Sequence, residues 1–161
     1  MNLEITNRIL ENAVFRREIE KLKILEKNRI FCCHGIEHSL DVARIAFILC
    51  IEKNVKINPD IIYSTALLHD IGRSREYTAN IPHHSAGIEI AEKILNEIGC
   101  HENMKNLILS LIKNHRNPDN PPDSPEYIFY TADKKSRLCF VCSAKDKCYW
   151  SADKKNMKIE V

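Results

Sequence analysis

A His-Asp doublet, His69-Asp70, stands at the end of an apolar run and is the part of the sequence best suited to chemistry. Imidazole and carboxylate groups both bind divalent cations, and a bound cation offsets the unfavourable burial of two ionisable side chains. Adjacent residues on a regular helix point about 100° apart, so both reach one ion most easily where the helix is distorted. Gly72 is well placed to allow that distortion. On its own the doublet also fits a simpler interpretation, a His bonded to a backbone carbonyl and an Asp in a turn.

Further His and Asp residues lie near the ends or first turns of other predicted helices. His38 precedes an apolar run, and His83 and His84 open a later helix. His115 closes the next helix, and Asp133 lies within the last one. Side chains from several helices of a bundle can converge on one or two metal ions. Chance can also place one His on each helix, so this pattern alone is not diagnostic.

The elements that must position these side chains are predicted to be helices. Asn58 and Ser124 each precede a Pro and an acidic residue, the pattern of a helix N-terminus, and Gly99 is a helix-terminating signal. Four of the six prolines fall between residues 116 and 125 and predict a loop, and a short loop should end at Pro82. No alternating pattern indicates strands, so we expect an all-α, single-domain helical bundle. The predicted helices cover residues 5–27, 36–51, 58–72, 83–98, 102–114 and 124–137.

Length and composition fit one globular domain, because the 161 residues are 44% hydrophobic and 29% charged. The longest apolar stretch, residues 45–51, is far shorter than the roughly 20 residues of a membrane span, and the N-terminus lacks a signal-peptide pattern. We therefore expect a cytoplasmic protein that does not bind membranes. The net charge of +2 is uneven, since residues from Lys134 onward hold eight Lys/Arg and three acids. Such tails suit anionic partners but are usually solvated surface, and we do not expect a nucleic acid partner.

Seven cysteines form a second group of residues that could bind a metal or form disulfides. Because the sequence lacks an export signal, we expect their thiols to be reduced. Cys139-x2-Cys142-x5-Cys148 could bind zinc or an iron–sulfur cluster if Cys32 or Cys33 supplied a fourth thiolate. The alternative is a set of reduced surface or packed cysteines without a metal. The sequence does not decide between the two, and it gives no oligomeric state.

The sequence His38…His69-Asp70…Asp133 resembles the H…HD…D signature of the HD-domain metal-dependent phosphohydrolases. The short sequence segments around these residues match the family pattern as well, and the resemblance covers residues 28–137. It implies an all-α fold in which His38, His69, Asp70 and Asp133 hold one divalent ion. We accordingly divide the chain into an N-terminal helix packed on the core (1–27), the HD domain (28–137) and a basic, cysteine-containing tail (138–161). The matching segments are Glu37-His38-Ser39-Leu40, Leu67-Leu68-His69-Asp70-Ile71-Gly72-Arg73 and Thr131-Ala132-Asp133-Lys134.

Two more histidines are similar to those of family members with extra ligands. His83, with Gly87 four residues later, resembles a His-x-x-x-Gly helix start, and His115 resembles the second added His. The resemblance implies a second ion bridged to the first by Asp70. His84 competes with His83 for this role. Alternatively, His83, His84 and His115 contact a substrate phosphate or cap helices.

The resemblance implies one or two divalent ions (Fe, Mn, Mg, Co or Zn) that activate water for attack on a phosphate. Asp70 and Arg73 are the candidate catalytic residues, Arg73 as a phosphate-binding cation or, alternatively, as an exposed helix-end Arg. The sequence lacks the Glu-Asp pair of alarmone hydrolases and the Gly-Tyr-Pro signature of cyclic-dinucleotide phosphodiesterases, so we expect a nucleotide or related phosphate ester as substrate, a dinucleoside polyphosphate among them. A di-iron oxygenase and a non-catalytic nucleotide-binding sensor are the alternatives. His34 is expected to support a ligand or lie on the surface, and His101 to be exposed.

Overall fold

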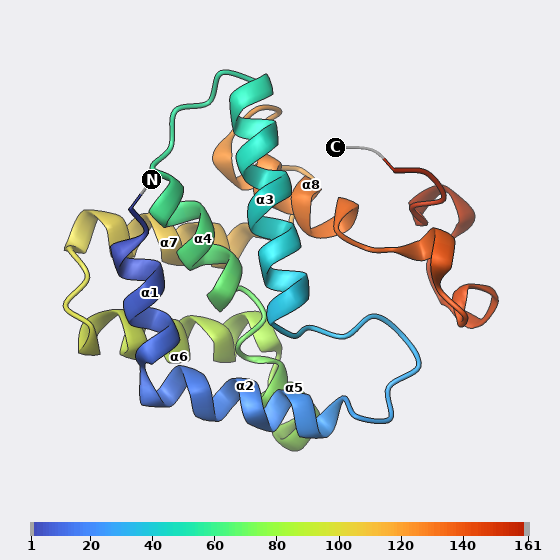
Figure 1. The fold of residues 1–161 in the computed structure, drawn as a ribbon, viewed down its shortest axis with the longest axis horizontal. Helices are drawn as coiled ribbons and strands as arrows, with labels where there is room; N and C mark the ends of the chain where they lie inside the picture. Colours follow the sequence, from blue (N-terminus) through green and yellow to red (C-terminus); the bar gives the residue numbers. More distant parts are fainter. Residues whose placement is uncertain (1, 160–161) are drawn as a thin grey trace.

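A computed structural model describes residues 2–159, which form eight α-helices and three short 3-10 helices and contain no strand (Figure 1). The expected all-α fold is therefore confirmed. Within the described part of the chain, no helix is both long and apolar enough to cross a bilayer. The helices are α1 (Glu4–Glu11), α2 (Ala13–Leu25), α3 (Ile36–Glu52), α4 (Pro59–Leu68), α5 (Arg73–Ala79), α6 (His83–Glu97), α7 (Glu102–Asn114), α8 (Pro125–Lys135), η1 (Cys139–Val141), η2 (Lys145–Lys147) and η3 (Ala152–Lys154).

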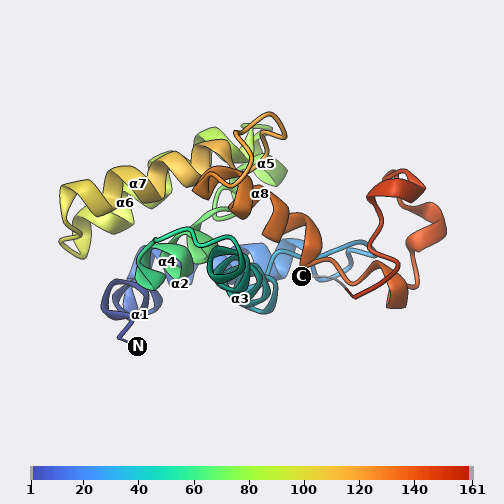
Figure 2. The same ribbon diagram turned by 90° about the horizontal axis from the view of Figure 1, so that it is seen from above.

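Helix α4 lies at the centre because its side chains leave no polar face for solvent. Asn58 caps its N-terminus by accepting a hydrogen bond from the backbone N–H of Asp60 at 2.9 Å, and Pro59 occupies the first turn. Eight of its ten residues are buried, and it packs against α3 on one side and α1 and α7 on the other. Figure 2 shows α6 and α7 on one side of the molecule and α1, α3 and α4 on the other.

Two apolar clusters meet at α4. One joins α4 to α1, α2, α6 and α7, and it receives Leu67 and Leu68 from α4. The other joins α4 to α3 and α8, and it receives Ile62 and Ala66. The turn that follows α4 therefore emerges where the two clusters adjoin, and it is fixed from both sides.

Asp60 also connects α4 to α1. Its buried carboxylate accepts hydrogen bonds from the backbone N–H groups of Ile5 and Thr6, each at 2.8 Å, and from the Thr6 hydroxyl at 2.6 Å. Leu3, at the N-cap position of α1, supplies no side-chain cap. An acid in the first turn of one helix thus satisfies the free N–H groups of another.

Two of the expected elements are wrong. The single helix predicted over 5–27 is broken at Asn12, whose side chain accepts hydrogen bonds from Val14 N and Phe15 N and caps a new helix, α2. The loop predicted between 73 and 82 is instead largely the helix α5, which ends at Asn80 in the left-handed conformation (φ 55°). The helix predicted over 58–72 also ends early, at Leu68, so the His-Asp doublet lies in the following turn.

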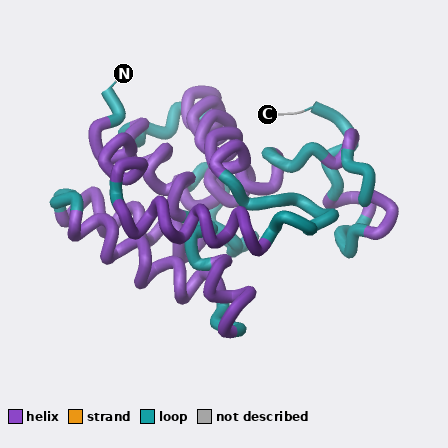
Figure 3. Tube along the Cα trace, turned by 60° about the horizontal axis from the view of Figure 1, so that its bottom comes forward, coloured by secondary structure: helices purple, strands orange, loops and turns teal. Residues whose placement is uncertain are grey.

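Residues 138–159 form an irregular segment, hereafter the tail, with η1, η2 and η3 as its only regular elements. It extends beside the loop between α2 and α3, as Figures 2 and 3 show. Asn156 attaches the tail to the end of α8 by donating hydrogen bonds to the backbone carbonyls of Lys134 (2.6 Å) and Arg137 (2.9 Å). Residue 1 of the predicted N-terminal helix and residues 160–161 of the predicted tail lie outside the described residues.

Candidate metal centre

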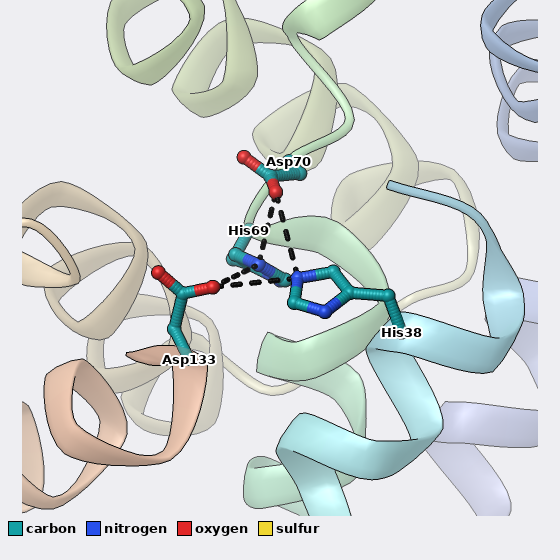
Figure 4. A group of neighbouring side chains, drawn as sticks. All are labelled: His38, His69, Asp70 and Asp133. Atoms are coloured by element: carbon teal, nitrogen blue, oxygen red, sulfur yellow. Dashed lines mark ion pairs between the residues drawn. The ribbon is translucent and has the colours of Figure 1, made fainter. Parts of the chain in front are cut away.

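Four side chains from two helices (α3 and α8) and the turn after α4 face a common point (Figure 4). The Nε2 atom of His69 is 3.2 Å from Asp70 Oδ2 and 3.8 Å from Asp133 Oδ1. The Nε2 atom of His38, in the first turn of α3, is 3.3 Å from Asp133 Oδ1 and 3.8 Å from Asp70 Oδ2. One ligand atom from each of the four lies within 4.8 Å of every other, so a single ion could contact them all.

A second group adjoins the first and shares Asp70. It consists of Asp70, His83 at the start of α6 and His115 at the end of α7, again with ligand atoms within 4.8 Å of one another. The Nε2 atom of His83 is 3.7 Å from Asp70 Oδ1, whereas the first group faces Oδ2 of the same carboxylate. Asp70 therefore has one oxygen toward each group, the arrangement of a bridging ligand. His84 is exposed, so of the two candidates it is His83 that the fold places in the group.

Buried ligand atoms in both groups lack hydrogen-bond partners. The atoms concerned are Nε2 of His38, His69 and His83 and Oδ2 of Asp70. Nearly all buried polar atoms in proteins have a hydrogen-bond partner. A site for an ion is one of the few explanations for a cluster of buried polar atoms without such partners. All four unpaired atoms point into the two groups, so the residues fit divalent cations on the evidence of their own geometry.

The opposite ring nitrogen of each histidine is held by a partner outside the groups. Nδ1 of His69 donates to the carbonyl of Ala66 at 2.8 Å, and Nδ1 of His115 donates to that of Ile112 at 2.5 Å. Nδ1 of His83 lies 2.9 Å from a carboxylate oxygen of Glu76, in α5. Such hydrogen bonds place the proton on Nδ1 and leave Nε2 as the free ligand atom, which is the usual arrangement of metal-bound histidines.

The ring of His38 has a different partner, the hydroxyl of Ser136, 3.2 Å from its Nδ1. Ser136 also donates to the backbone carbonyl of Asp133 at 2.8 Å. One hydroxyl thus links the His of α3 to the segment of α8 that carries the second carboxylate.

Cations surround the two carboxylates. Arg137 NH2 donates to Asp133 Oδ1 at 3.0 Å, and Lys134 binds the other oxygen. Arg73, the predicted phosphate-binding cation, instead donates from Nε to Asp70 Oδ1 at 3.0 Å and from NH1 to Glu76 at 3.0 Å. Its side chain is 19% exposed, so it is neither the solvent-exposed helix-end Arg of the alternative nor a free cation.

Burial and charge set the protonation of the histidines in the metal-free protein. Burial lowers the pKa of both His38 and His115 to about 4, so both are neutral at pH 7. Burial also lowers the pKa of His69, but the negative charges of Asp70 and Asp133 have the larger effect. Together they raise the pKa of His69 to about 9. Although burial opposes ionisation of Asp70 and Asp133, adjacent histidines hold the pKa of each carboxyl well below its usual range. In the metal-free protein, the proton on His69 therefore neutralises part of the charge of the two carboxylates, as a bound cation would.

Gly72 is needed for close packing rather than for an unusual backbone conformation. Its φ of −77° is available to any residue, contrary to the expected role in distorting the helix. A Cβ on Gly72 would lie 2.1 Å from the carbonyl oxygen of His83 and 2.5 Å from the backbone N of Gly87. The backbone after Asp70 therefore lies directly against the start of α6, which accounts for the His-x-x-x-Gly spacing of His83 and Gly87.

His34 lies at the edge of the first group and is buried, with 4% of its surface exposed. Its Nε2 is 4.0 Å from Asp70 Oδ2, and its Nδ1 lies 2.5 Å from a carboxylate oxygen of Glu26. Glu26 also accepts hydrogen bonds from His34 N and the Tyr77 hydroxyl. Sequence reasoning did not identify Glu26, Glu76, Ser136 or Arg137, because each reaches a residue of the site only through contacts that the fold creates. His101 is exposed, as expected.

The family model described as HD domain matches residues 35–138. An uncharacterised protein of Clostridium beijerinckii is 40% identical over 153 residues, covering 95% of this chain and 96% of that protein. Ribonuclease Y of Clostridium kluyveri is 33% identical over 100 residues, covering 56% of this chain and 19% of its own length. Ribonuclease Y of Clostridium botulinum is 29% identical with the same coverage. No solved structure matches the chain.

Proposed function

This chain belongs to the HD domain family, and from that premise we propose that it is a metal-dependent phosphohydrolase acting on a nucleotide or related phosphate ester. The observation that carries the proposal is the set of unpaired, buried ligand atoms converging from His38, His69, Asp70 and His83. We further propose His115 and Asp133 as ligands, because their ligand atoms complete the two groups that share Asp70. A divalent ion bound there would lower the pKa of its water toward 7 and so supply hydroxide at neutral pH.

The remaining steps of hydrolysis need groups that orient the substrate and hold protons. We assign proton transfer to the leaving oxygen to His34. Glu26 fixes its ring through Nδ1, which leaves Nε2 directed at the edge of the first group. An imidazole held in this way can exchange a proton without moving its ring.

We propose Arg73 and Lys134 as the cations that receive phosphate charge. Both now pair with the carboxylates of the centre, Arg73 with Asp70 and Lys134 with Asp133. Ions bound between those carboxylates would weaken both pairs and release N–H groups toward a phosphate oxygen. The excess of basic residues from Lys134 onward, eight Lys/Arg against three acids, also suits an anionic substrate.

The ester class is supported by the ribonuclease Y relatives, although this chain covers only 19% of their length. We propose a small nucleotide rather than RNA as substrate, because the ligand side chains are almost entirely buried. Asp70 is 5% exposed and His69 and His83 are fully buried. A single phosphate group is easier to admit to such a site than a polymer backbone.

The test is a phosphate-release screen of the full chain loaded with Mn²⁺, Fe²⁺, Co²⁺, Mg²⁺ or Zn²⁺. The substrates are nucleoside mono- and triphosphates, dinucleoside polyphosphates and a chromogenic ester. Asp70→Ala should lower kcat/KM by more than about 100-fold, because even residues that merely support a metal ligand contribute about 10–100-fold. Asp41→Ala, at an acid that is 44% exposed, is the matched control and should keep activity.

Three results would contradict the proposal. Turnover that survives Asp70→Ala would place the reaction elsewhere. Two bound irons with oxygen consumption and no phosphate release would indicate an oxygenase on the same scaffold. Tight nucleotide binding without turnover under every metal would indicate a sensor.

A further inference from the structure

Four cysteines from two distant segments line one small cavity outside the His/Asp centre. Cys32 comes from the loop between α2 and α3, and Cys139, Cys142 and Cys148 come from the tail. The cavity measures about 20 Å³, which is room for a single water-sized occupant. All four thiols are free of disulfide bonds.

The short helices of the tail explain how cysteines from separate parts of the tail line the same cavity. Cys139 begins η1 and Cys142 follows it, joined by a backbone hydrogen bond of 3.2 Å from Cys142 N to Cys139 O. Cys148 follows η2 in the same way. Each tight turn brings the chain back toward the cavity. The adjacent Cys33 is exposed, and its sulfur contacts the carbonyl of Phe31.

We propose that Cys32, Cys139, Cys142 and Cys148 form a structural zinc site that fastens the tail to the loop between α2 and α3. Four thiolates are a common ligand set for a closed, tetrahedral zinc site. An iron–sulfur cluster would need space for several iron and sulfide ions, whereas this cavity admits one small occupant. This proposal is independent of the phosphohydrolase function.

The charges around the cavity suit such a site. Four thiolates on one dication leave a net charge of −2, and Lys145 and Lys155 both line the cavity. Burial raises the pKa of the Cys32 thiol, and the charge of Arg137 opposes that rise. Basic neighbours of this kind stabilise thiolates.

The tail has little else to hold it in place. Of residues 138–159, only Cys139 and Ala144 are buried, while Val141 and Tyr149 are 69% and 83% exposed. A segment without its own apolar core usually depends on a metal or on disulfides for a fixed structure. Zinc would supply that constraint beside the loop between α2 and α3, in addition to the hydrogen bonds that Asn156 donates to the end of α8.

The four sulfurs are not yet at the spacing of a filled site. Among residues 2–159, only the two His/Asp groups have ligand atoms that all lie within 4.8 Å of one another. Zinc binding must therefore draw the thiols inward. Arg137, whose charge acts on Cys32, donates a hydrogen bond to Asp133 of the His/Asp centre.

The test uses the full chain, purified without chelator and loaded with Zn²⁺ alone. Its variants are Cys32→Ser, Cys142→Ser, the neighbouring control Cys33→Ser and Asp70→Ala. Elemental analysis should show one zinc fewer in Cys32→Ser and Cys142→Ser than in the wild type, with no loss in Cys33→Ser. Asp70→Ala should lose metal from the His/Asp centre but keep this zinc. Equal zinc in Cys32→Ser and Cys33→Ser would overturn the proposal.

Two measurements on the wild type keep the proposal testable if a variant does not fold. Cobalt substitution should produce thiolate-to-cobalt charge-transfer bands, which His and Asp ligands cannot give. Alkylation followed by mass spectrometry should show zinc-dependent protection of Cys32, Cys139, Cys142 and Cys148, with Cys33 labelled in either state. Cobalt without thiolate bands, or Cys32 labelled as fast as Cys33 in the presence of zinc, would refute the site, as would a disulfide among the four.

Discussion

The His/Asp centre and the cysteine cluster hold their ligands in different ways. Ligands of the first come from well-packed helices and from the buried turn after α4, and the opposite nitrogens of its histidines are fixed by hydrogen bonds to groups such as the Ala66 carbonyl and Glu76. Ligands of the second lie in loops and short turns, and their sulfurs are further apart. A helical core can therefore preorganise a metal centre before any ion arrives, whereas a segment without a core needs the ion to organise it.

The largest effect is expected from His83→Ala. This change removes a ligand from the second His/Asp group without touching the first, so it should weaken binding of one ion by more than about 100-fold. Metal titration should show one site lost and one retained, with the proposed zinc of the tail unchanged. His84→Ala, at an exposed neighbour, is the control and should bind both ions normally. Equal losses in the two variants would refute the assignment of His83.

Gly72→Ala should be the next most damaging change. The new methyl group meets backbone atoms of His83 and Gly87 that cannot rotate away, so the free energy of unfolding should fall by about 1–3 kcal/mol. Gly35→Ala is matched to it, because there the nearest atom is the mobile carboxylate of Glu37 at 3.0 Å. Denaturant unfolding measures both. A Gly72→Ala protein as stable as Gly35→Ala would show that the contact is looser than described.

Metal affinity of the His/Asp centre should rise with pH up to about 9. The raised pKa of His69 means that its proton stabilises the metal-free protein below about pH 6.5 and that this stabilisation is lost as the pH rises through about 9. An incoming ion must displace that proton, so affinity should rise by about tenfold per pH unit between those limits. Titrations at several pH values with one weakly binding metal measure this slope. A flat profile would contradict a protonated His69.

The smallest effect is expected from Ser136→Ala. It removes the hydroxyl that links the His38 ring to the end of α8, and loss of such a supporting contact should weaken metal binding by about tenfold. Ser85→Ala, at an exposed serine of α6, should have no effect. Competition against a metal indicator resolves a difference of this size. An unchanged affinity would show that His38 is positioned by packing alone.

The sequence predicted the helices whose ends carry local signals. Asn58 and Ser124 as N-caps and Gly99, with φ 64°, as a terminator all hold in the structure. Asn12 was missed because it interrupts an otherwise continuous apolar stripe with a polar residue that a helix tolerates. Helix α5 was missed because its residues are mostly polar and its stability comes from contacts such as that between Ser74 and Glu18.

The candidate ligands were visible in the sequence, but their partners were not. Recognisable sequence motifs contain the ligands His38, His69, Asp70 and Asp133. Glu26 and Ser136 lie outside any motif and reach the centre only through the fold. Likewise, spacing alone left Cys32 and Cys33 equivalent, and only the direction of the loop separates them. Long-range pairing depends on how helices pack, which no local pattern encodes.

Anomalous X-ray scattering from crystals of the metal-loaded protein tests the central claim most directly. Data collected at the absorption edge of the bound metal should show a peak at the point shared by His38, His69, Asp70 and Asp133, within about 2.0–2.2 Å of the His nitrogens. A second peak should lie between Asp70, His83 and His115. A protein that carries metal but shows no peak among these residues would contradict the account.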